Sequence, residues 1–573
     1  MKKQWRILTP DPHAVNEISA GLACSPVVAA ILVNRKIDSL DAAGRFMDPS
    51  LNHIRPPFAM AGMDVAVERL ARAVAKKEKV LVFGDYDADG VTATAVLYEF
   101  FRQIGSDVSY YVPHRISEGY SLRPAHIQNH ALPAGVKLIV TADCGSASYG
   151  AVETARRAGI DVIVSDHHKI SSALPKALAV INPNRHDCDT GYEHLSGVGV
   201  AFSLVICLRK RLREMNFWAD GDEPNLKTLC DLVAIGTVAD IVPLIEENRI
   251  FTKAGLEVIA SESRCGIKAL AKESRIDIHA ADAADIAFRL APRINAAGRM
   301  DHAALAVELL VTGDPEKADR IARRLNTLNA GRQKAEQQIV AGIHRKLDAA
   351  PRLLGKHSLV LDHSDWHEGI IGIAASRAVE QFFRPTVLIS VKDGIGKGSA
   401  RSIPGFDLYQ GLSACAEDLE AFGGHAMAAG LTIKSSRIEI FRQHFESIVQ
   451  ATTRPDDFVP TIRIDSELNL NRISPGLIDE IEALQPFGSG NPEPLFMARG
   501  IQVLSPRIVG QKHRRFLLNQ ADNPSPGPFP AIQFNIDPSR PLPEHVGKIA
   551  FRLRWNRWRG KRTPQLIVEE AQA

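Results

Sequence analysis

The feature that most constrains this chain is the stretch Val80 to Gly90, which reads VLVFGDYDADG. Four apolar residues rich in β-formers end at a glycine, a pattern typical of a buried parallel strand. Asp85, Asp87 and Asp89 then follow at alternate positions. Carboxylates this close raise one another's pKa unless a cation lies among them, and Mg²⁺ and Mn²⁺ favour such oxygen ligands. The stretch predicts a divalent metal site; the alternative is an acidic surface turn.

Two further strand patterns end in residues of the same kind. Lys137 to Asp143 reads KLIVTAD, and Val162 to His168 reads VIVSDHH. Strands that alternate with helical patterns, such as the helix expected from Thr92 to Arg102, indicate a mostly parallel α/β sheet. Ligands of such sheets bind at the carboxyl ends of the strands, so we expect the three loops to meet in one crevice. Imidazole suits Mn²⁺ better than Mg²⁺, so two adjacent histidines favour manganese.

Two isolated charged residues also suggest a site. Asp240 lies near the end of LCDLVAIGTVADIVPL, an almost entirely apolar segment. A buried unpaired carboxylate is costly, so Asp240 is expected either to pair with a cationic side chain or, preferably, to bind metal. Arg115, in VPHRISEGY, could neutralise a phosphate with its planar fork of donors, but it could equally be a surface arginine on a turn.

Length and composition limit the class of protein. A chain of 573 residues is too long for one core and predicts three or four domains. Seven scattered cysteines without a CxxC pair favour a reducing cytoplasm over a disulfide framework. No apolar run reaches the length of a bilayer span, and no apolar core follows the basic start, which argues against a secretory signal. We expect a cytoplasmic protein with no membrane segment.

The chain divides into five regions, and the fold class is multidomain α/β with a C-terminal β-barrel. Asp314 and Pro315 suit the N-cap and first turn of a long connecting helix, and Asp285 to Met300 suggests a basic, Pro-broken turn. The expected regions are an N-terminal lead-in packed on the catalytic core (1–63), a parallel-sheet catalytic domain (64–313), the connecting helix (314–350), a second α/β domain (351–453) and the barrel (454–573).

The C-terminal region combines short strand patterns with a high density of basic residues. The strands suggest a small barrel such as an OB-fold. Basic side chains with interleaved aromatics suit single-stranded nucleic acid; the alternative is a solvated basic face with aromatics in the core. The basic residues, with few acids among them in the sequence, are Arg507, Lys512, Arg514, Arg515, Lys548, Arg552, Arg554, Arg557, Arg559, Lys561 and Arg562, and the aromatic ones are Phe516, Phe534, Trp555 and Trp558.

A resemblance to a known family joins these observations. GDYDADG, TADCG, SDHH and GTVAD occur in the order of the four motifs of the DHH phosphoesterase superfamily. Within it, VPHRISEGY, INPNR, LSGVGVAF, PRINAAGRM and FGGHAMAAG resemble the RecJ family of bacterial single-stranded-DNA exonucleases, over nearly the whole chain. His114 and Cys144 depart from the pattern, because asparagines are expected at both positions.

The resemblance implies a DHH catalytic domain, a DHH-associated substrate-binding domain and a site in named positions. Two divalent ions, Mn²⁺ preferred and Mg²⁺ as the alternative, would be held by Asp85, Asp87, Asp89, Asp143, His167, His168 and Asp240. The DxDAxG pattern of related enzymes fits Asp85 and Asp87 better than Asp89. The catalytic group would be Asp166, His167 and His168, with Asp166 orienting a histidine. The DNA-binding group would be Arg115, Tyr120, Arg293, Asn295, Arg299, Ser399, Arg401, Gly424 and His425.

The function that the resemblance implies is hydrolysis of single-stranded DNA from its 5′ end to 5′-mononucleotides, in DNA repair and recombination. The implied partners are single-stranded DNA with a 5′ end, a helicase and a single-strand-binding protein. One alternative is a phosphatase of small substrates, but such an enzyme needs no extended basic track. Another is a non-catalytic DNA-binding scaffold, and the retention of every expected acidic and imidazole ligand argues against it.

Overall fold

The first α/β lobe, which the sequence predicts to be catalytic and which is called the catalytic lobe below, is built on a five-stranded parallel sheet with the order β3-β2-β4-β5-β6. β2 and β4 are buried along their whole length, as their unbroken apolar runs predicted. β2 comes first in the chain but lies between β3 and β4, so the strand order reverses there and a crevice forms at the carboxyl ends. The strands are β2 (Val80–Gly84), β3 (Val108–Tyr111), β4 (Leu138–Ala142), β5 (Asp161–Ser165) and β6 (Ala179–Ile181).

Helices cover both faces of this sheet and supply the rest of the lobe. The largest apolar cluster among the described residues lies between the sheet and one group of these helices, and a smaller cluster lies under α7 on the other face. The main helices are α4 (Met63–Ala75), α5 (Ala88–Gln103), α7 (Tyr149–Arg157), α8 (Gly197–Glu214), α9 (Cys230–Ala239), α10 (Glu246–Glu262), α11 (Cys265–Ser274), α13 (Ala291–Met300) and α14 (Ala304–Val311).

The segment expected to be a Pro-broken turn is helical instead. A short helix, α12 (Ala283–Asp285), is followed by a π-helical turn (Ile286–Leu290) and then by α13, which carries Pro292 in its first turn. Proline is tolerated there because the N–H groups in the first turn of a helix have no partner within the helix, so the N–H that proline lacks is not needed. The sequence interpretation was wrong because it took Pro292 as a breaker.

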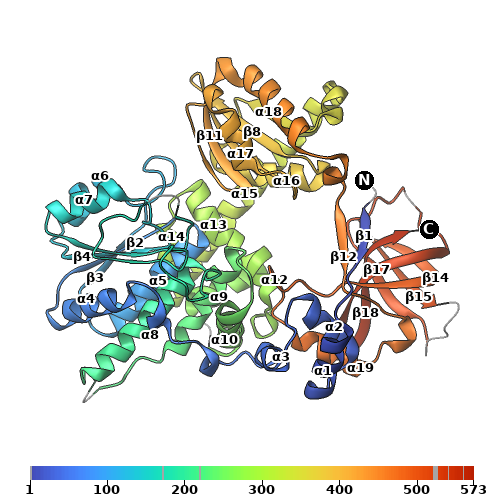
Figure 1. The fold of residues 1–573 in the computed structure, drawn as a ribbon, viewed down its shortest axis with the longest axis horizontal. Helices are drawn as coiled ribbons and strands as arrows, with labels where there is room; N and C mark the ends of the chain where they lie inside the picture. The colour runs from blue at the N-terminus through green and yellow to red at the C-terminus, as the bar shows by residue number, and fades with distance from the viewer. Residues whose placement is uncertain are drawn as a thin grey trace.

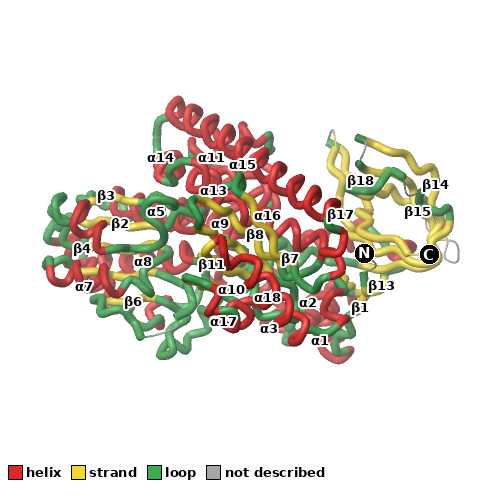
Figure 2. Tube along the Cα trace, turned by 90° about the horizontal axis from the view of Figure 1, so that it is seen from above, coloured by secondary structure: helices red, strands yellow, loops and turns green. Residues whose placement is uncertain are grey.

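The long helix α15 (Pro315–Ala349) leads from the catalytic lobe to the second α/β lobe, with Asp314 as its N-cap as predicted (Figures 1 and 2). The sheet of the second lobe has the order β10-β11-β9-β8-β7 and is mixed, because only β7 and β8 are parallel. Its elements are β7 (Leu359–His363), α16 (Glu368–Phe382), β8 (Thr386–Lys392), β9 (Ile395–Arg401), α17 (Leu408–Ala414), β10 (Ala421–Gly424), β11 (Ala428–Lys434) and α18 (Ile438–Thr452).

The C-terminal lobe is a closed five-stranded barrel, which confirms the OB-like prediction. The order is β14-β15-β16-β18-β17, and β17 pairs again with β14, so the sheet closes on itself. The elements are β12 (Thr461–Ile464), β13 (Ser466–Glu467), α19 (Pro475–Ala483), β14 (Phe496–Val509), β15 (His513–Gln520), β16 (Phe529–Gln533), β17 (His545–Trp558) and β18 (Lys561–Gln572).

The N-terminal region packs mainly on the barrel and not on the catalytic core. Its strand β1 (Gln4–Ile7) pairs with β12, and its helices α1 (Pro12–Leu22), α2 (Pro26–Asn34) and α3 (Leu40–Met47) bury their apolar faces against α19 and the barrel (Figure 1). Only the later residues, such as Met60, join the catalytic core. The expected packing therefore holds only for the end of the region, because apolar periodicity does not specify which core a helix joins.

The computed structural model describes residues 3–170, 173–218, 221–262, 264–510, 512–520, 527–539, 541–558 and 560–572. None of the helices in these ranges combines the length and the apolar character that a membrane span requires.

Candidate metal centre

The acidic loop turns directly from β2 into α5. Asp87 is the N-cap of α5, and its Oδ1 accepts hydrogen bonds from the backbone N–H groups of Asp89 (3.0 Å) and Gly90 (3.1 Å). A Cβ on Gly90 would lie 2.6 Å from the Cβ of Asp85, so only glycine permits this close return of the chain. The helix therefore starts at Ala88, earlier than the expected Thr92, and Asp89 lies in its first turn.

Asp89 is fixed by the start of α8. Its two carboxylate oxygens accept hydrogen bonds from the N–H groups of Gly197 (2.7 Å) and Val198 (2.8 Å). A Cβ on Gly197 would lie 2.6 Å from the Cβ of Asp143, so the glycine allows α8 to approach the acids. The positive end of the α8 dipole stabilises this carboxylate. The glycine-rich segment LSGVGVAF thus positions an acid of the site.

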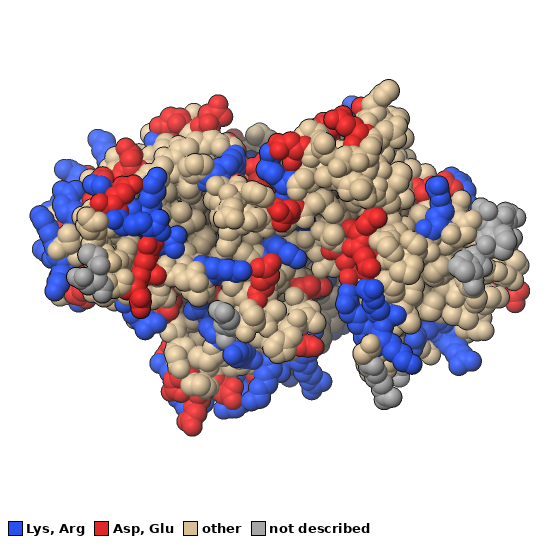
Figure 3. Space-filling view, turned by 90° about the horizontal axis from the view of Figure 1, so that it is seen from below, with Lys and Arg blue, Asp and Glu red and all other residues tan. Residues whose placement is uncertain are grey.

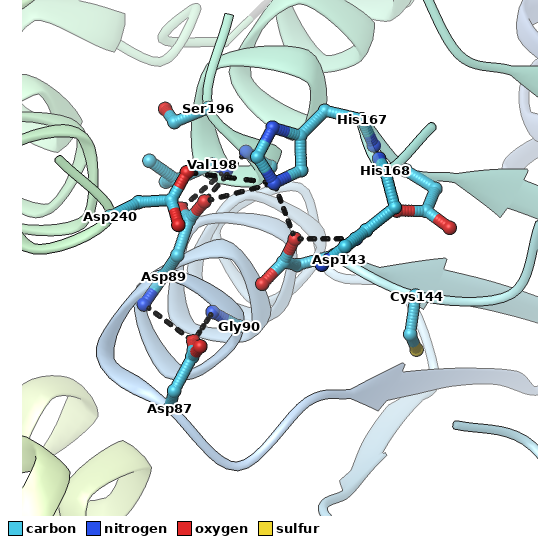
Figure 4. Close-up of polar contacts among 12 residues, drawn as sticks. Asp87, Asp89, Gly90, Asp143, Cys144, His167, His168, Ser196, Val198 and Asp240 are labelled. Carbon is cyan, nitrogen blue, oxygen red and sulfur yellow. Dashed lines mark hydrogen bonds and ion pairs between the residues drawn. The ribbon is translucent and has the colours of Figure 1, made fainter. Parts of the chain in front are cut away.

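His167 presents one ring nitrogen to three carboxylates (Figure 4). Its Nδ1–H donates to the carbonyl oxygen of Leu195 at 2.9 Å, which leaves Nε2 as the free donor atom for a cation. Nε2 lies 3.2 Å from Asp143, 3.6 Å from Asp240 and 3.9 Å from Asp89. Metal-binding histidines typically donate their other N–H to a carbonyl or carboxylate, as His167 does.

Asp166 orients His168 and does not face the other acids. Its oxygens accept hydrogen bonds from the N–H groups of Ser146, His167 and His168 and from Nδ1 of His168 at 2.8 Å. Burial raises the pKa of Asp166, but the hydrogen bond from His168 and the other donors outweigh it and hold the pKa below its usual value. Burial lowers the pKa of His168, yet the hydrogen bond to Asp166 and the charge of Asp143 raise it to about 10.

The donor set fits divalent cations. Oxygen and nitrogen atoms lie within 4.8 Å of one another in each of three groups: Asp85, Asp87 and Asp143; Asp89, His167 and Asp240; and Asp143, His167 and His168. Oδ1 of Asp85 and Oδ1 of Asp143 are buried and accept no hydrogen bond from any residue that the structure describes. An unpaired buried carboxylate oxygen is costly, and a cation would satisfy both atoms. The three strand-end loops and Asp240 therefore meet in one place, as predicted.

The same acids should make the stability of the metal-free protein depend on pH. Burial, followed by the charge of Asp89, raises the pKa of Asp240 to about 7. In the unfolded chain an aspartate titrates near pH 3.9, so protonation favours the folded state, and this stabilisation is lost as the pH rises through about 7. We expect the melting temperature in EDTA to rise by about 2 to 4 °C between pH 8 and pH 6.

Differential scanning fluorimetry with EDTA or Mn²⁺ measures this effect. Mn²⁺ should remove the dependence, because it stabilises the ionised carboxylates. Asp240→Asn should flatten the curve recorded in EDTA. An equal pH dependence in this variant would show that Asp240 is not its source.

Three arginines of the predicted DNA-binding group meet beside the acids. Burial, and then the charge of Arg115, lowers the pKa of both Arg299 and Arg401. The charge of Arg401 also lowers the pKa of Arg299, and the charge of Asp87 raises it. Nη1 of Arg299 donates to the carbonyl oxygen of Gly369 at 3.0 Å. Arg115 lies over the ring of Tyr86, with 4.8 Å between its guanidinium carbon and the ring centroid. Three guanidinium groups clustered in this way favour an anion such as phosphate.

The second lobe adds neutral donors to this cluster. Arg401 donates to Oγ of Ser399 at 3.1 Å, which ties both side chains to the end of β9. His425 lies near His168 and Lys169, since burial and then these two charges lower its pKa. Gly424, its neighbour, has a φ of 147°, and a Cβ there would lie 2.5 Å from Cα of Ala429. Both α/β lobes therefore contribute to one site.

Tyr120 lies against the histidines. Its hydroxyl is 3.4 Å from Nδ1 of His168, and its ring meets that of Tyr86 edge-on at 6.2 Å. Burial, and then the charges of Asp166 and Asp143, raise its pKa well above the usual value, so the hydroxyl keeps its proton.

Two residues of the predicted DNA-binding group are engaged in holding the protein together. Arg293 donates to Oδ1 of Asn326 on α15 and to the carbonyl oxygen of Arg289. Asn295 accepts a hydrogen bond from the N–H of Ala88 at 2.8 Å and so fixes the acidic loop. The structure does not bring Arg293 together with the three clustered arginines.

His114 and Cys144, the two positions that depart from the family pattern, both make defined contacts with the backbone. Nδ1 of His114 accepts hydrogen bonds from the N–H groups of Ile116 (3.3 Å) and Ser117 (3.2 Å), as an asparagine side chain could. Cys144 is buried, and its Sγ lies 3.8 Å from the carbonyl oxygen of Phe83. Burial, and then the charge of Asp85, raise the pKa of this thiol well above its usual value.

Two asparagines with a role in the site were not singled out from the sequence. Asn182 and Asn184 donate to the carbonyl oxygens of His168 (2.9 Å) and His167 (2.5 Å), respectively. Asn182 directly follows the end of β6, and Asn184 comes two residues later. The rule that polar residues at parallel strand ends face the crevice would have found them in the INPNR motif.

The basic residues of the barrel face more acids than the sequence suggested. Arg552 and Arg554 pair with Glu493, and acids of α19 pair with Arg557 and Arg562. Residues distant in sequence supply these acids, which a local composition count does not detect. Figure 3 shows Lys and Arg side chains on the barrel side of this face, with acidic groups beside them, and others at the opposite end of the molecule.

The aromatic residues of the barrel fall into two groups. Phe516 is buried in the core, and Nε1 of Trp555 donates to Asp479. Phe534 and Trp558 are exposed. Arg559 lies outside the described residues.

Comparison with known domain families assigns all three lobes. The family described as "DHH family, N-terminal domain" matches residues 79–237, the "DHHA1 domain" matches residues 355–451, and the "RecJ OB domain" matches residues 464–570.

Full-length relatives and solved structures agree with this assignment. "Single-stranded-DNA-specific exonuclease RecJ" of Dickeya dadantii is 40% identical over 89% of this chain and 90% of its own. The protein of the same name from Escherichia coli is 36% identical over 99% of both chains. The crystal structure of RecJ in complex with Mn²⁺ from Thermus thermophilus superposes with a TM-score of 0.84, at 29% identity, over 100% of this chain and 79% of that one. A Mg²⁺ complex of the same protein gives a TM-score of 0.78. The chain belongs to the RecJ family.

Proposed function

We propose that this chain is a metal-dependent exonuclease that hydrolyses single-stranded DNA from the 5′ end and releases 5′-mononucleotides. The observation that carries the proposal is the cluster of Arg115, Arg299 and Arg401 beside the carboxylate and histidine centre. A cation cluster for a terminal phosphate next to a hydrolytic centre favours attack near a strand end. The family relatives, named as single-stranded-DNA-specific exonucleases, support the activity.

Two divalent ions, with Mn²⁺ preferred, fit the donor groups. Asp85 and Asp87 would hold one ion, Asp89, His167 and Asp240 the other, and Asp143 would contact both. When bound, such ions lower the pKa of water and stabilise the charge that develops on a phosphodiester.

The side chains of the protein do the remaining work. The three arginines bind and orient the 5′ phosphate, with Ser399 as a neutral donor. His168, held through Nδ1 by Asp166, directs Nε2 away from that carboxylate and can donate a proton or a hydrogen bond to the substrate. Tyr120 covers this histidine and offers a ring for the first base. His425 and Gly424 close the site from the second lobe.

A channel between the two α/β lobes that admits only one strand, together with the barrel, would select single strands. Phe534 and Trp558 expose rings on the barrel, and rings of this kind stack on bases without regard to sequence. Action in the cytoplasm, together with a helicase and a single-strand-binding protein, belongs to the same proposal.

Release of nucleotides from strands labelled at either end tests the proposal. With Mn²⁺, a 5′ label on a long single strand should appear first as a mononucleotide, and a 3′ label should appear last. Cleavage of dinucleotides only would support the phosphatase alternative. Tight binding without any release would support the scaffold, and first release of the 3′ label would contradict the polarity.

A further inference from the structure

The segment that follows Asp240 adopts an unusual backbone. Ile241 has a φ of 62° and Glu246 a φ of 44°, both in the left-handed region. A β-branched residue with positive φ is a genuine outlier, and Ile241 is also 74% exposed. Such backbone persists only where surrounding structure holds it. Asp240 itself is the C-cap of α9, so the segment begins at the acid that faces His167.

A turn of the C-terminal region, Gly488–Asn491, lies directly on this segment. The N–H of Leu244 donates to the carbonyl oxygen of Ser489 at 2.7 Å. A Cβ on Gly490 would lie 2.8 Å from the Cβ of Pro243, and a Cβ on Gly488 would lie 2.7 Å from Cδ1 of Leu244. The absence of a Cβ at Gly488 and Gly490 therefore permits this close contact, and a larger residue at either position would push the turn and the segment apart.

The turn is itself anchored from within its own region and from the N-terminal one. Asn491 is fully buried, and its Nδ2 donates to the carbonyl oxygens of Leu484 (2.8 Å) and Pro486 (2.9 Å). Its Oδ1 accepts a hydrogen bond from Nε of Arg35 at 2.8 Å. Contacts outside the catalytic lobe therefore hold the shape of the turn.

A second contact fixes the base of the turn to the catalytic lobe. Arg249 on α10 is buried and donates to the carbonyl oxygens of Leu484 and Phe46, each at 2.9 Å. Burial, and then the charge of Arg35, lower the pKa of Arg249 to about 9, and α3 and α19 direct carbonyl groups at their C-terminal ends toward it. Since α10 begins at Glu246, the first contact falls within the strained segment and the second follows it in the first turn of α10.

We propose that the Gly488–Asn491 turn is a positioning element for the metal centre. By holding the segment from Ile241 to Ile245, it sets the place of the Asp240 carboxylate, and thereby the affinity of the Asp89, His167 and Asp240 group for its ion. The inference rests on the metal centre of the proposed function. It assigns the C-terminal region a part in metal binding in addition to any contact with DNA.

Gly490→Ala tests the proposal, with Gly105→Ala as its matched control. Both glycines have a φ of 71°, so alanine strains the backbone alike, but Gly105 has no atom within 4 Å of the added Cβ. We expect Gly490→Ala to weaken the binding of one Mn²⁺ ion by roughly 10-fold to 100-fold, as for groups that orient metal ligands. Isothermal titration with Mn²⁺, and the electron paramagnetic resonance signal of free Mn²⁺, measure this without reference to cleavage.

Two further measurements separate positioning from general damage. In EDTA, the affinity of Gly490→Ala and of Gly105→Ala for a 30-nucleotide single strand should stay within twofold of that of the unmodified chain. The rate of hydrogen exchange at the Leu244 amide should rise only in Gly490→Ala. Gly488→Ala is the second variant if Gly490→Ala does not fold, because its added Cβ would press only on the side chain of Leu244. It should weaken the binding of the same Mn²⁺ ion.

The outcomes are distinguishable. Equal Mn²⁺ affinity in the glycine variants and the control would overturn this inference alone. Absence of Mn²⁺ binding by the unmodified chain would overturn both the metal centre and this inference.

Discussion

Replacement of Asp143 by asparagine is expected to lower the rate of nucleotide release by at least about three orders of magnitude. Asp143 belongs to two of the three donor groups, and its Oδ1 is buried without a hydrogen-bond donor among the described residues. Loss of a single transition-state donor costs roughly 10²-fold to 10³-fold, and loss of a ligand shared by two ions should cost at least as much. The amide keeps the shape of the side chain, but it removes the charge and replaces one acceptor oxygen with an NH₂ donor.

Labelled single strands with Mn²⁺ measure the loss, and strand binding in EDTA should stay within threefold. Asp365→Asn is the matched control, because Asp365 is an exposed carboxylate of the second lobe and its loss should not change the rate. A second consequence concerns the metal-free protein. Burial, and then the charge of Asp89, raise the pKa of Asp143 well above its usual value, so Asp143→Asn should raise the melting temperature in EDTA. A rate of nucleotide release in Asp143→Asn equal to that of the unmodified chain would contradict the role of Asp143.

Replacement of Arg401 by alanine is expected to weaken binding of a 5′-phosphorylated strand by about 10-fold to 100-fold. A hydrogen bond to a charged group contributes roughly 1.5 to 3 kcal/mol, which corresponds to that range. The partly buried position of Arg401 limits screening by solvent. A strand with a 5′ hydroxyl should lose less than threefold, since it carries no terminal phosphate.

Binding is best compared in EDTA, where no cleavage occurs. Arg377→Ala supplies the control, because Arg377 lies on the same lobe but pairs with Glu336 and Glu380 at the surface. If Arg401→Ala weakened both strands equally, the side chain would serve the strand in general and not its end. If it changed neither affinity, the proposed phosphate pocket would be wrong.

Much of the fold could be predicted because the signals were local. The apolar run before Asp85 and the acids at alternate positions identified β2 and the loop after it, since strand burial and turn chemistry depend on adjacent residues. The N-cap of α15 at Asp314 was predicted for the same reason. The barrel was predicted from a run of short strand patterns, and the closure of β17 on β14 confirmed it.

Other features depended on contacts that local patterns do not encode. The first three helices joined the barrel core, although the sequence placed them on the catalytic core. The basic barrel residues paired with distant acids such as Glu493. Arg293 turned toward α15, and Pro292 began a helix where a break was expected.

For the site, the order of the amino acids was enough to predict which chemical groups are present and at which strand ends they lie. Residue type and strand polarity are local properties, so the acids, the histidines and their shared edge of the sheet were readable in advance. How each group is used depends on the folded chain: Asp89 accepts hydrogen bonds from the first N–H groups of α8, Asp166 holds His168, and the Gly488–Asn491 turn contacts the backbone after Asp240. These roles arise where chain segments hundreds of residues apart come within hydrogen-bonding distance, and side-chain packing specifies which segments meet.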